Sequence, residues 1–112
     1  MGLNVYLKDI GVHSGEEFEL YSDGITHNLN EMAEAAGIYE VLWRPEDEGI
    51  ELASEIIPIL EEGLEALIEN PLYFEKFNPV NGWGTYDYLV RFCTNYLKAC
   101  KLYPDSYVEV SR

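Results

Sequence analysis

Three short segments alternate apolar and polar residues with the two-residue period of a half-buried strand. Residues 3–7 and 17–21 show this pattern on either side of a glycine-containing segment at 11–15, which predicts a β-hairpin. Residues 106–111 alternate in the same way near the other end of the chain. We expect this third strand to join the hairpin, which would bring the two termini into one sheet.

The middle of the chain follows helical spacing instead. Asn28 followed by Glu31 resembles a capping box at a helix start, and Gly37 is suited to a left-handed stop. A short helix is expected at residues 38–43, ended by Pro45, because the residue before proline disfavours the α region.

The clearest helical pattern covers residues 48–70, which carry one apolar stripe. Pro58 interrupts the segment, but the stripe stays in phase on both sides. Either one kinked helix or two abutting helices would satisfy this pattern. The stripe consists of Ala53, Ile56, Ile57, Leu60, Leu64, Leu67 and Ile68.

After a further helical turn at residues 72–77 and a loop at 78–84, Thr85 is a candidate cap for a final helix that Pro104 ends. The expected buried stripe of that helix is Tyr86, Leu89, Val90, Cys93, Leu97 and Cys100. The sequence therefore predicts a single α+β domain over residues 1–112. We expect a small antiparallel sheet, made of the N-terminal hairpin and the C-terminal strand, covered by three to five helices.

Charge is the outlying property of the composition. The 112 residues include 21 acidic side chains against 7 Lys and Arg, for a formal net charge of −14. Such a field repels nucleic-acid phosphates and anionic membrane surfaces, so neither is an expected direct partner. The negative charge does favour solubility and the attraction of basic proteins, although many cytosolic proteins are acidic without a basic partner.

Cysteine usage and the absence of targeting signals favour a cytoplasmic protein. Cys93 and Cys100 stand seven residues apart on the expected final helix, roughly 10 Å, beyond the reach of a disulfide. We expect both to be reduced and buried. No apolar run has the length of a membrane span, and the N-terminus lacks the regions of a signal peptide.

Acidic residues dominate the segment between Pro45 and Lys76, which contains ten of them and no basic residue. Five fall three, four or seven positions apart, the spacing of one exposed helix row opposite the apolar stripe. This row is Glu51, Glu55, Glu62, Glu65 and Glu69. It is either a solvated face or a docking surface for a basic partner. In the second case its steps of roughly 5–6 Å resemble phosphates along a nucleic-acid strand.

Six other residues could form a ligand pocket: His27, Asn28, Tyr39, Trp43, Arg44 and Trp83. His27 and Asn28 belong to a polar segment, residues 22–28, expected just before a helix. An anion could bind there, or Thr26 and Asn28 could simply cap the helix, with His27 beside the cap. Tyr39, Trp43 and Arg44 could grip a planar or anionic ligand, or close the edge of the core. Trp83, between two glycines, is either a pocket wall or a loop anchor.

Standard catalytic and cofactor motifs are absent from the sequence. It contains no nucleophile elbow, phosphate-binding loop, dinucleotide fingerprint, zinc spacing or calcium loop. We therefore assign no catalytic residue, cofactor or metal, and we expect a non-enzymatic protein.

Several short motifs resemble a family of small uncharacterised proteins of bacteria and their phages. They are residues 25–29 (ITHNL), 37–39 (GIY), 42–45 (LWRP), 81–84 (NGWG) and the terminal Ser-Arg pair, and the similarity runs from about Ser22 to the C-terminus. The resemblance implies a bacterial or phage cytoplasmic setting and transfers no catalytic residue.

Two functions follow as hypotheses. The leading one is an interaction protein whose acidic helix face binds a basic protein, as a phage-type modulator or nucleic-acid mimic. The alternative is a small-molecule site, for binding or a minor enzymatic activity, built around His27, Tyr39, Trp43, Arg44 and Trp83. The oligomeric state does not follow from the sequence.

Overall fold

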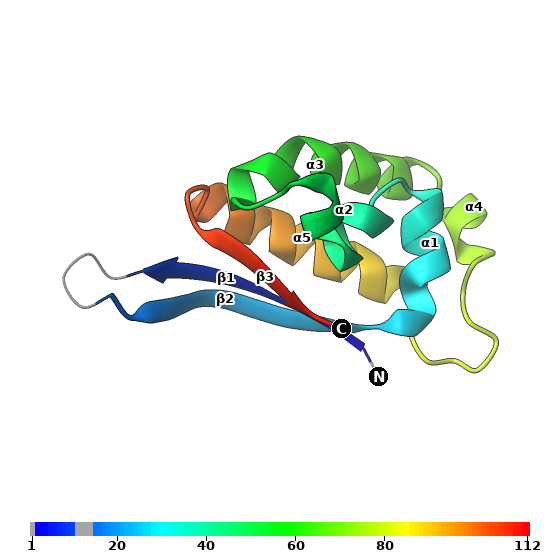
Figure 1. The fold of residues 1–112 in the computed structure, drawn as a ribbon. Helices are drawn as coiled ribbons and strands as arrows, with labels where there is room; N and C mark the ends of the chain where they lie inside the picture. Colours follow the sequence, from blue (N-terminus) through cyan, green and yellow to red (C-terminus); the bar gives the residue numbers. More distant parts are fainter. Residues whose placement is uncertain (1, 11–14) are drawn as a thin grey trace.

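A three-stranded antiparallel sheet with helices on one face forms the protein, as the computed structural model shows for residues 2–10 and 15–112 (Figure 1). Strand β1 (Gly2–Ile10) lies in the centre, between β2 (Glu17–Thr26) and β3 (Tyr107–Ser111). The expected α+β fold, with the C-terminal strand joined to the N-terminal hairpin, is confirmed.

The pleat of β1 determines which face of the sheet is covered. Leu3, Val5 and Leu7 are fully buried against the helices, whereas Asn4, between them, is exposed. The expected turn at residues 11–15 falls mainly on residues 11–14, outside the described part of the chain.

Strand β2 is longer than its sequence predicts. The alternation was recognisable over residues 17–21, but the strand continues to Thr26 because residues 2–6 of β1 pair with it along this stretch. Residues 22–26 therefore lie in the sheet, and they still directly precede a helix, because a short 3-10 helix begins at His27.

Five α-helices and two short 3-10 helices occur in the described residues. Their bounds are η1 (His27–Leu29), α1 (Asn30–Ala35), α2 (Tyr39–Trp43), η2 (Pro45–Glu48), α3 (Ala53–Glu69), α4 (Pro71–Glu75) and α5 (Tyr86–Leu102). Of the two expected caps, Thr26 is confirmed and Asn28 is wrong, because the Thr26 hydroxyl accepts the Asn28 amide (3.3 Å) at the start of η1. Gly37 does adopt the expected left-handed conformation, with φ of 77°.

Helix α3 is one continuous helix that contains Pro58 as its sixth residue, which decides between the two alternatives for this segment. It begins at Ala53, five residues later than expected, because Gly49 turns the chain with φ of 69° after η2. Ile68, expected in the apolar stripe, is 57% exposed, and Ile57 is only partly buried.

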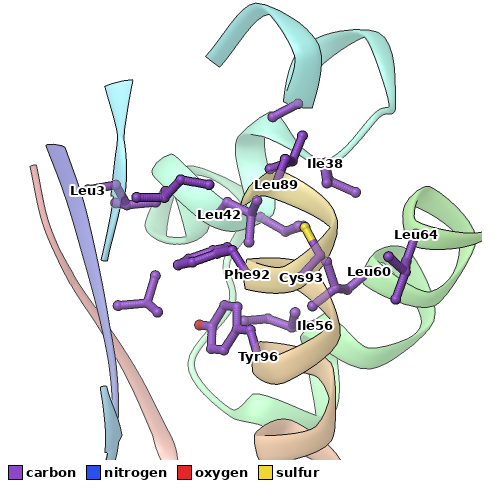
Figure 2. Close-up of a cluster of buried hydrophobic side chains, with 14 of the residues drawn as sticks. Leu3, Ile38, Leu42, Ile56, Leu60, Leu64, Leu89, Phe92, Cys93 and Tyr96 are labelled. Carbon is purple, nitrogen blue, oxygen red and sulfur yellow. The ribbon is translucent and has the colours of Figure 1, made fainter. Parts of the chain in front are cut away.

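Helix α5 contacts both β2 and α3, so it is covered on two sides. Figure 2 shows Phe92 and Tyr96 directed from α5 toward the strands, while Ile56 and Leu60 meet α5 from α3. The stripe predicted from the sequence assumed that only one side of α5 is covered, so it omitted Phe92 and Tyr96. Three residues that it did include, Tyr86, Val90 and Leu97, are only partly buried. The buried residues of α5 are Leu89, Phe92, Cys93, Tyr96, Ala99 and Cys100.

The loop between α4 and α5, yellow in Figure 1, is attached at several points. Thr85 occupies the N-cap position of α5, but its side chain makes no capping bond. The side-chain oxygen of Asn78 instead accepts the Tyr86 amide (2.8 Å). Gly84, with φ of 97°, lies so close to Thr26 that an added Cβ would be 2.7 Å from Thr26 Cγ2. The loop is thus held against the end of β2.

Candidate functional site

The acidic row survives on α3 as three carboxylates, Glu62, Glu65 and Glu69. All three are exposed, on the side of the helix opposite the buried Leu60 and Leu64. No Lys or Arg among the described residues lies within ion-pair distance of them. Their charges are therefore available to a partner.

The basic residues that do form ion pairs in residues 2–10 and 15–112 use other carboxylates. Lys8 contacts Glu17 and Glu109, Lys101 contacts Glu61, and Arg112 contacts Glu46. Glu61 adjoins the row in sequence, and its pair with Lys101 (3.2 Å) crosses from α3 to α5. The neutralised carboxylate thus lies on the flank of α3 that faces α5.

Glu55 stabilises the start of α3 rather than standing free. Its carboxylate accepts the backbone amides of Leu52 (2.9 Å) and Glu51 (3.1 Å). These bonds, from Leu52 first, lower the pKa of the Glu55 carboxyl below its usual value. A residue expected to meet a partner is thus used to complete a helix end.

Glu51 does not belong to the helix row. It lies before Ala53, the first residue of α3, and its carbonyl accepts the Val108 amide of β3 (2.9 Å). The expected position on the row is therefore wrong, although the Glu51 side chain is exposed. Gly49 is again the cause. It ends the preceding 3-10 helix in a left-handed conformation, and the chain is extended at Leu52 before α3 begins.

His27 and Tyr39, both partly buried, come together around the buried Trp43 at the edge of the core. Trp43 is 2% exposed, its Nε1–H donates to His27 Nδ1 (2.9 Å), and Tyr39 stacks on its indole with ring centres 5.4 Å apart. This bond assigns the acceptor role to Nδ1, so the neutral imidazole carries its proton on Nε2. The contacts support core closure, one of the two alternatives for these aromatics.

Arg44, Asn28 and Trp83 are exposed. Arg44 directly follows the buried Trp43. The pKa of the Glu46 carboxyl is lowered, first by a hydrogen bond with its own backbone and then by the positive charges of Arg112 and Arg44. Trp83 and Asn28, with His27, line a shallow hollow of about 580 Å³ at the end of β2. Trp43, Tyr39 and Arg44 do not line it, so the six predicted ligand residues do not share one cavity, and His27 is the residue that both lines this hollow and contacts Trp43.

A second hollow, of about 600 Å³, lies between the end of β2, the loop at residues 81–84 and α5. We call it the Arg91 hollow. Its polar and aromatic wall includes Asp23, Asn81, Trp83, Tyr88, Arg91 and Asn95. Sequence reasoning missed Tyr88, Arg91 and Asn95, although Arg91, with Tyr88 three residues before it and Phe92 directly after it, meets the same criterion of an arginine near aromatics that selected Arg44.

The two thiols are poor candidates for nucleophiles. Cys93 and Cys100 are both free and buried. Burial raises the pKa of Cys100 to about 12 and that of Cys93 well above its usual value. In residues 2–10 and 15–112, no group of three His, Cys, Asp or Glu side chains is arranged to hold a metal ion.

No helix of the described chain is both long and apolar enough to cross a membrane. No family model matches the chain, and no curated protein or solved structure is significantly similar to it. The resemblance to small bacterial and phage proteins thus stays a prediction, and function has to be inferred from the surfaces described above.

Proposed function

We propose that this protein is a non-enzymatic interaction protein whose α3 face binds a basic protein partner. The observation that carries the proposal is the row of Glu62, Glu65 and Glu69, exposed on one helix and with no Lys or Arg of residues 2–10 and 15–112 within ion-pair distance. Like charges three or four residues apart destabilise a helix by a few tenths of a kcal/mol. A cationic partner would remove this repulsion on binding.

The geometry of the row supports the narrower proposal of a nucleic-acid mimic. Neighbouring carboxylates three or four residues apart on a helix lie roughly 5–6 Å from each other. Phosphates along one strand are also several ångströms apart, so a groove that binds a nucleic-acid backbone would accept such a ridge. The net charge of −14 would speed the approach of a basic protein.

We also propose a cytoplasmic, phage-type or host-regulatory role. Support comes from the two buried free thiols, which suit a reducing compartment, and from the resemblance of residues 25–29 and 81–84 to bacterial and phage proteins.

The test compares two variants that lose the same charge. The row variant carries Glu62→Gln, Glu65→Gln and Glu69→Gln. The control carries Glu31→Gln, Glu34→Gln and Glu40→Gln, three exposed residues of α1 and α2. Glu55 is left unchanged, because its substitution would disturb the start of α3.

Immobilised wild type, row variant and control are exposed to a bacterial extract, and bound proteins are eluted with duplex DNA. We expect a basic protein that wild type and control retain and the row variant loses. With that protein purified, its affinity should fall steeply as salt rises, and the row variant should bind at least about tenfold more weakly than the control. Equal affinity of the two variants would contradict the proposal of a basic partner, and the absence of any DNA-displaced protein would contradict the nucleic-acid mimic.

A further inference from the structure

We infer that the Arg91 hollow is a binding site for a small planar aromatic anion, a ligand class that combines a flat ring with a carboxylate or phosphate. The inference uses a different surface from the α3 row and is independent of the proposed protein partner. It rests on the size of the hollow, the state of its two charged residues and the rigidity of its aromatic wall.

The dimensions fit a small molecule. A volume of about 600 Å³ lies within the range of roughly 300–1,000 Å³ that is usual for ligand pockets. Three glycines, Gly24, Gly82 and Gly84, line it and contribute no side chains that would fill it. Backbone groups and ring faces are thereby left open to a ligand.

The two charged side chains of the wall differ in whether they already have partners. Asp23 accepts the Gly24 amide (2.8 Å) and the Tyr21 hydroxyl (3.3 Å), so its carboxylate is engaged within the protein. Arg91 forms no ion pair with a described residue, not even with Asp87 one turn before it. The guanidinium lies 5.8 Å from the centre of the Tyr88 ring. Asp23 keeps its negative charge, but its oxygens already accept donors of the protein, whereas the N–H groups of Arg91 have no acceptor among the described residues and stay open to an anion.

Arg44, Lys76 and Lys98 also form no ion pair among the described residues, but of these basic side chains only Arg91 lines the hollow. Its planar fork can bind a carboxylate or phosphate with two hydrogen bonds while its face stays on the Tyr88 ring. Carboxylates elsewhere on the surface weaken this attraction only modestly, because salt screens exposed charges beyond a Debye length of about 8 Å. Within the hollow, Arg91 is the charged side chain whose hydrogen-bonding groups remain open, so it is the group that would bind an anion.

Two exposed aromatic side chains provide surfaces for a ring. Trp83 is 71% exposed and Tyr88 is 60% exposed, both unusually accessible for such large apolar groups. They approach the hollow from different elements, the loop after α4 and the first turn of α5. A flat ring between them would bury apolar area that both now leave in water.

The loop that carries Trp83 is already ordered for binding. The Trp83 amide donates to the side-chain oxygen of Asn81 (2.9 Å), and the Gly82 amide donates to the Pro79 carbonyl (3.2 Å). These two bonds order the loop internally, and the backbone of Gly84 packs so close to Thr26 that a side chain would not fit there. A ligand would then lose less affinity to the ordering of the wall.

The experiment measures binding of matched probes by titration calorimetry. Adenosine monophosphate has both ring and charge, adenosine has only the ring, and ribose phosphate has only the charge. Indole acetate offers the same combination with a carboxylate. We expect wild type to bind adenosine monophosphate or indole acetate more tightly than adenosine or ribose phosphate, and the tighter of the two anions identifies the phosphate or carboxylate source.

Three variants assign the roles. Arg91→Gln should weaken the aromatic anion about tenfold or more and leave adenosine unchanged, because only the charge-assisted bonds are lost. Trp83→Ala should weaken both. Arg44→Gln is the matched control, since it removes an exposed arginine outside the hollow and should change neither. No binding of either aromatic anion, equal binding of ribose phosphate, or equal effects of Arg91→Gln and Arg44→Gln would overturn the inference.

Discussion

Replacement of Gly63 by alanine tests the packing that presents the acidic face of α3. Gly63 lies in the middle of this helix and is buried against the residues that follow α1. A Cβ at this position would lie 2.1 Å from Ile38 Cγ2 and 3.1 Å from the Ala36 carbonyl oxygen. Ile38 is itself fully buried.

Two opposing effects decide the sign of the change in stability. In an exposed helix interior, alanine is more favourable than glycine by about 1 kcal/mol. Two carbon atoms are comfortable at roughly 3.5–4.0 Å, so the new methyl must move Ile38 or the helix by more than about 1 Å. Overpacking of this kind costs typically 1–3 kcal/mol and occasionally more. The very close approach to Ile38 places this site in the upper part of that range, about 2–3 kcal/mol, so after the alanine gain we expect Gly63→Ala to lower the free energy of unfolding by about 1–2 kcal/mol net.

Urea unfolding followed by circular dichroism measures this loss, and a double-mutant cycle identifies its cause. Ile38→Ala alone should cost about 2–5 kcal/mol through the cavity that it leaves. In that background the Gly63 methyl enters space that the Ile38 side chain has vacated, so Gly63→Ala should cost at least about 1 kcal/mol less than in wild type. Glu62→Ala, on the exposed face next to it, should stay within about 0.5 kcal/mol of wild type. A neutral or stabilising Gly63→Ala, or equal costs in both backgrounds, would refute the reasoning.

Three further predictions concern single side chains. Trp43→Phe removes the indole N–H that donates to His27 and part of the buried ring, so the free energy of unfolding should fall by about 2 kcal/mol; an unchanged urea midpoint would contradict this. Tyr96→Phe removes a buried hydroxyl that has no hydrogen-bond partner among the described residues, so thermal unfolding should show equal stability or a gain of about 1 kcal/mol, whereas a clear loss would reveal a partner for the hydroxyl. Glu55 has a folded pKa below its reference value of 4.5, because it accepts backbone amides, that of Leu52 first. The contribution of the Glu55 carboxylate to the free energy of unfolding should be complete above pH 4.5 and lost as pH falls through the lower folded pKa. Glu55→Gln should therefore be less stable than wild type near neutrality and should lose less stability on acidification. If the stability of the two proteins fell in parallel with pH, the hydrogen bonds of the carboxylate would not be the cause.

The sequence by itself determined those features that depend on local periodicity. The alternation around Leu3, Val5 and Leu7 identified the central strand, because only every second side chain of a strand reaches the core. The helical stripe of residues 53–67 identified α3 and placed Glu62, Glu65 and Glu69 on its outer side. Turn chemistry at Gly37 located a helix end, since glycine tolerates the left-handed conformation that such an end requires.

Tertiary contacts decided the rest. Residues 22–26 became strand because β1 pairs with them, and Trp43 became core because its indole meets His27, sixteen residues away in sequence. The Arg91 hollow joins β2, a loop and α5, which no local pattern connects. Spacing along the chain reports which side chains share a face of one element. Which faces meet, and which charges are then left without a partner, depends on how distant elements pack.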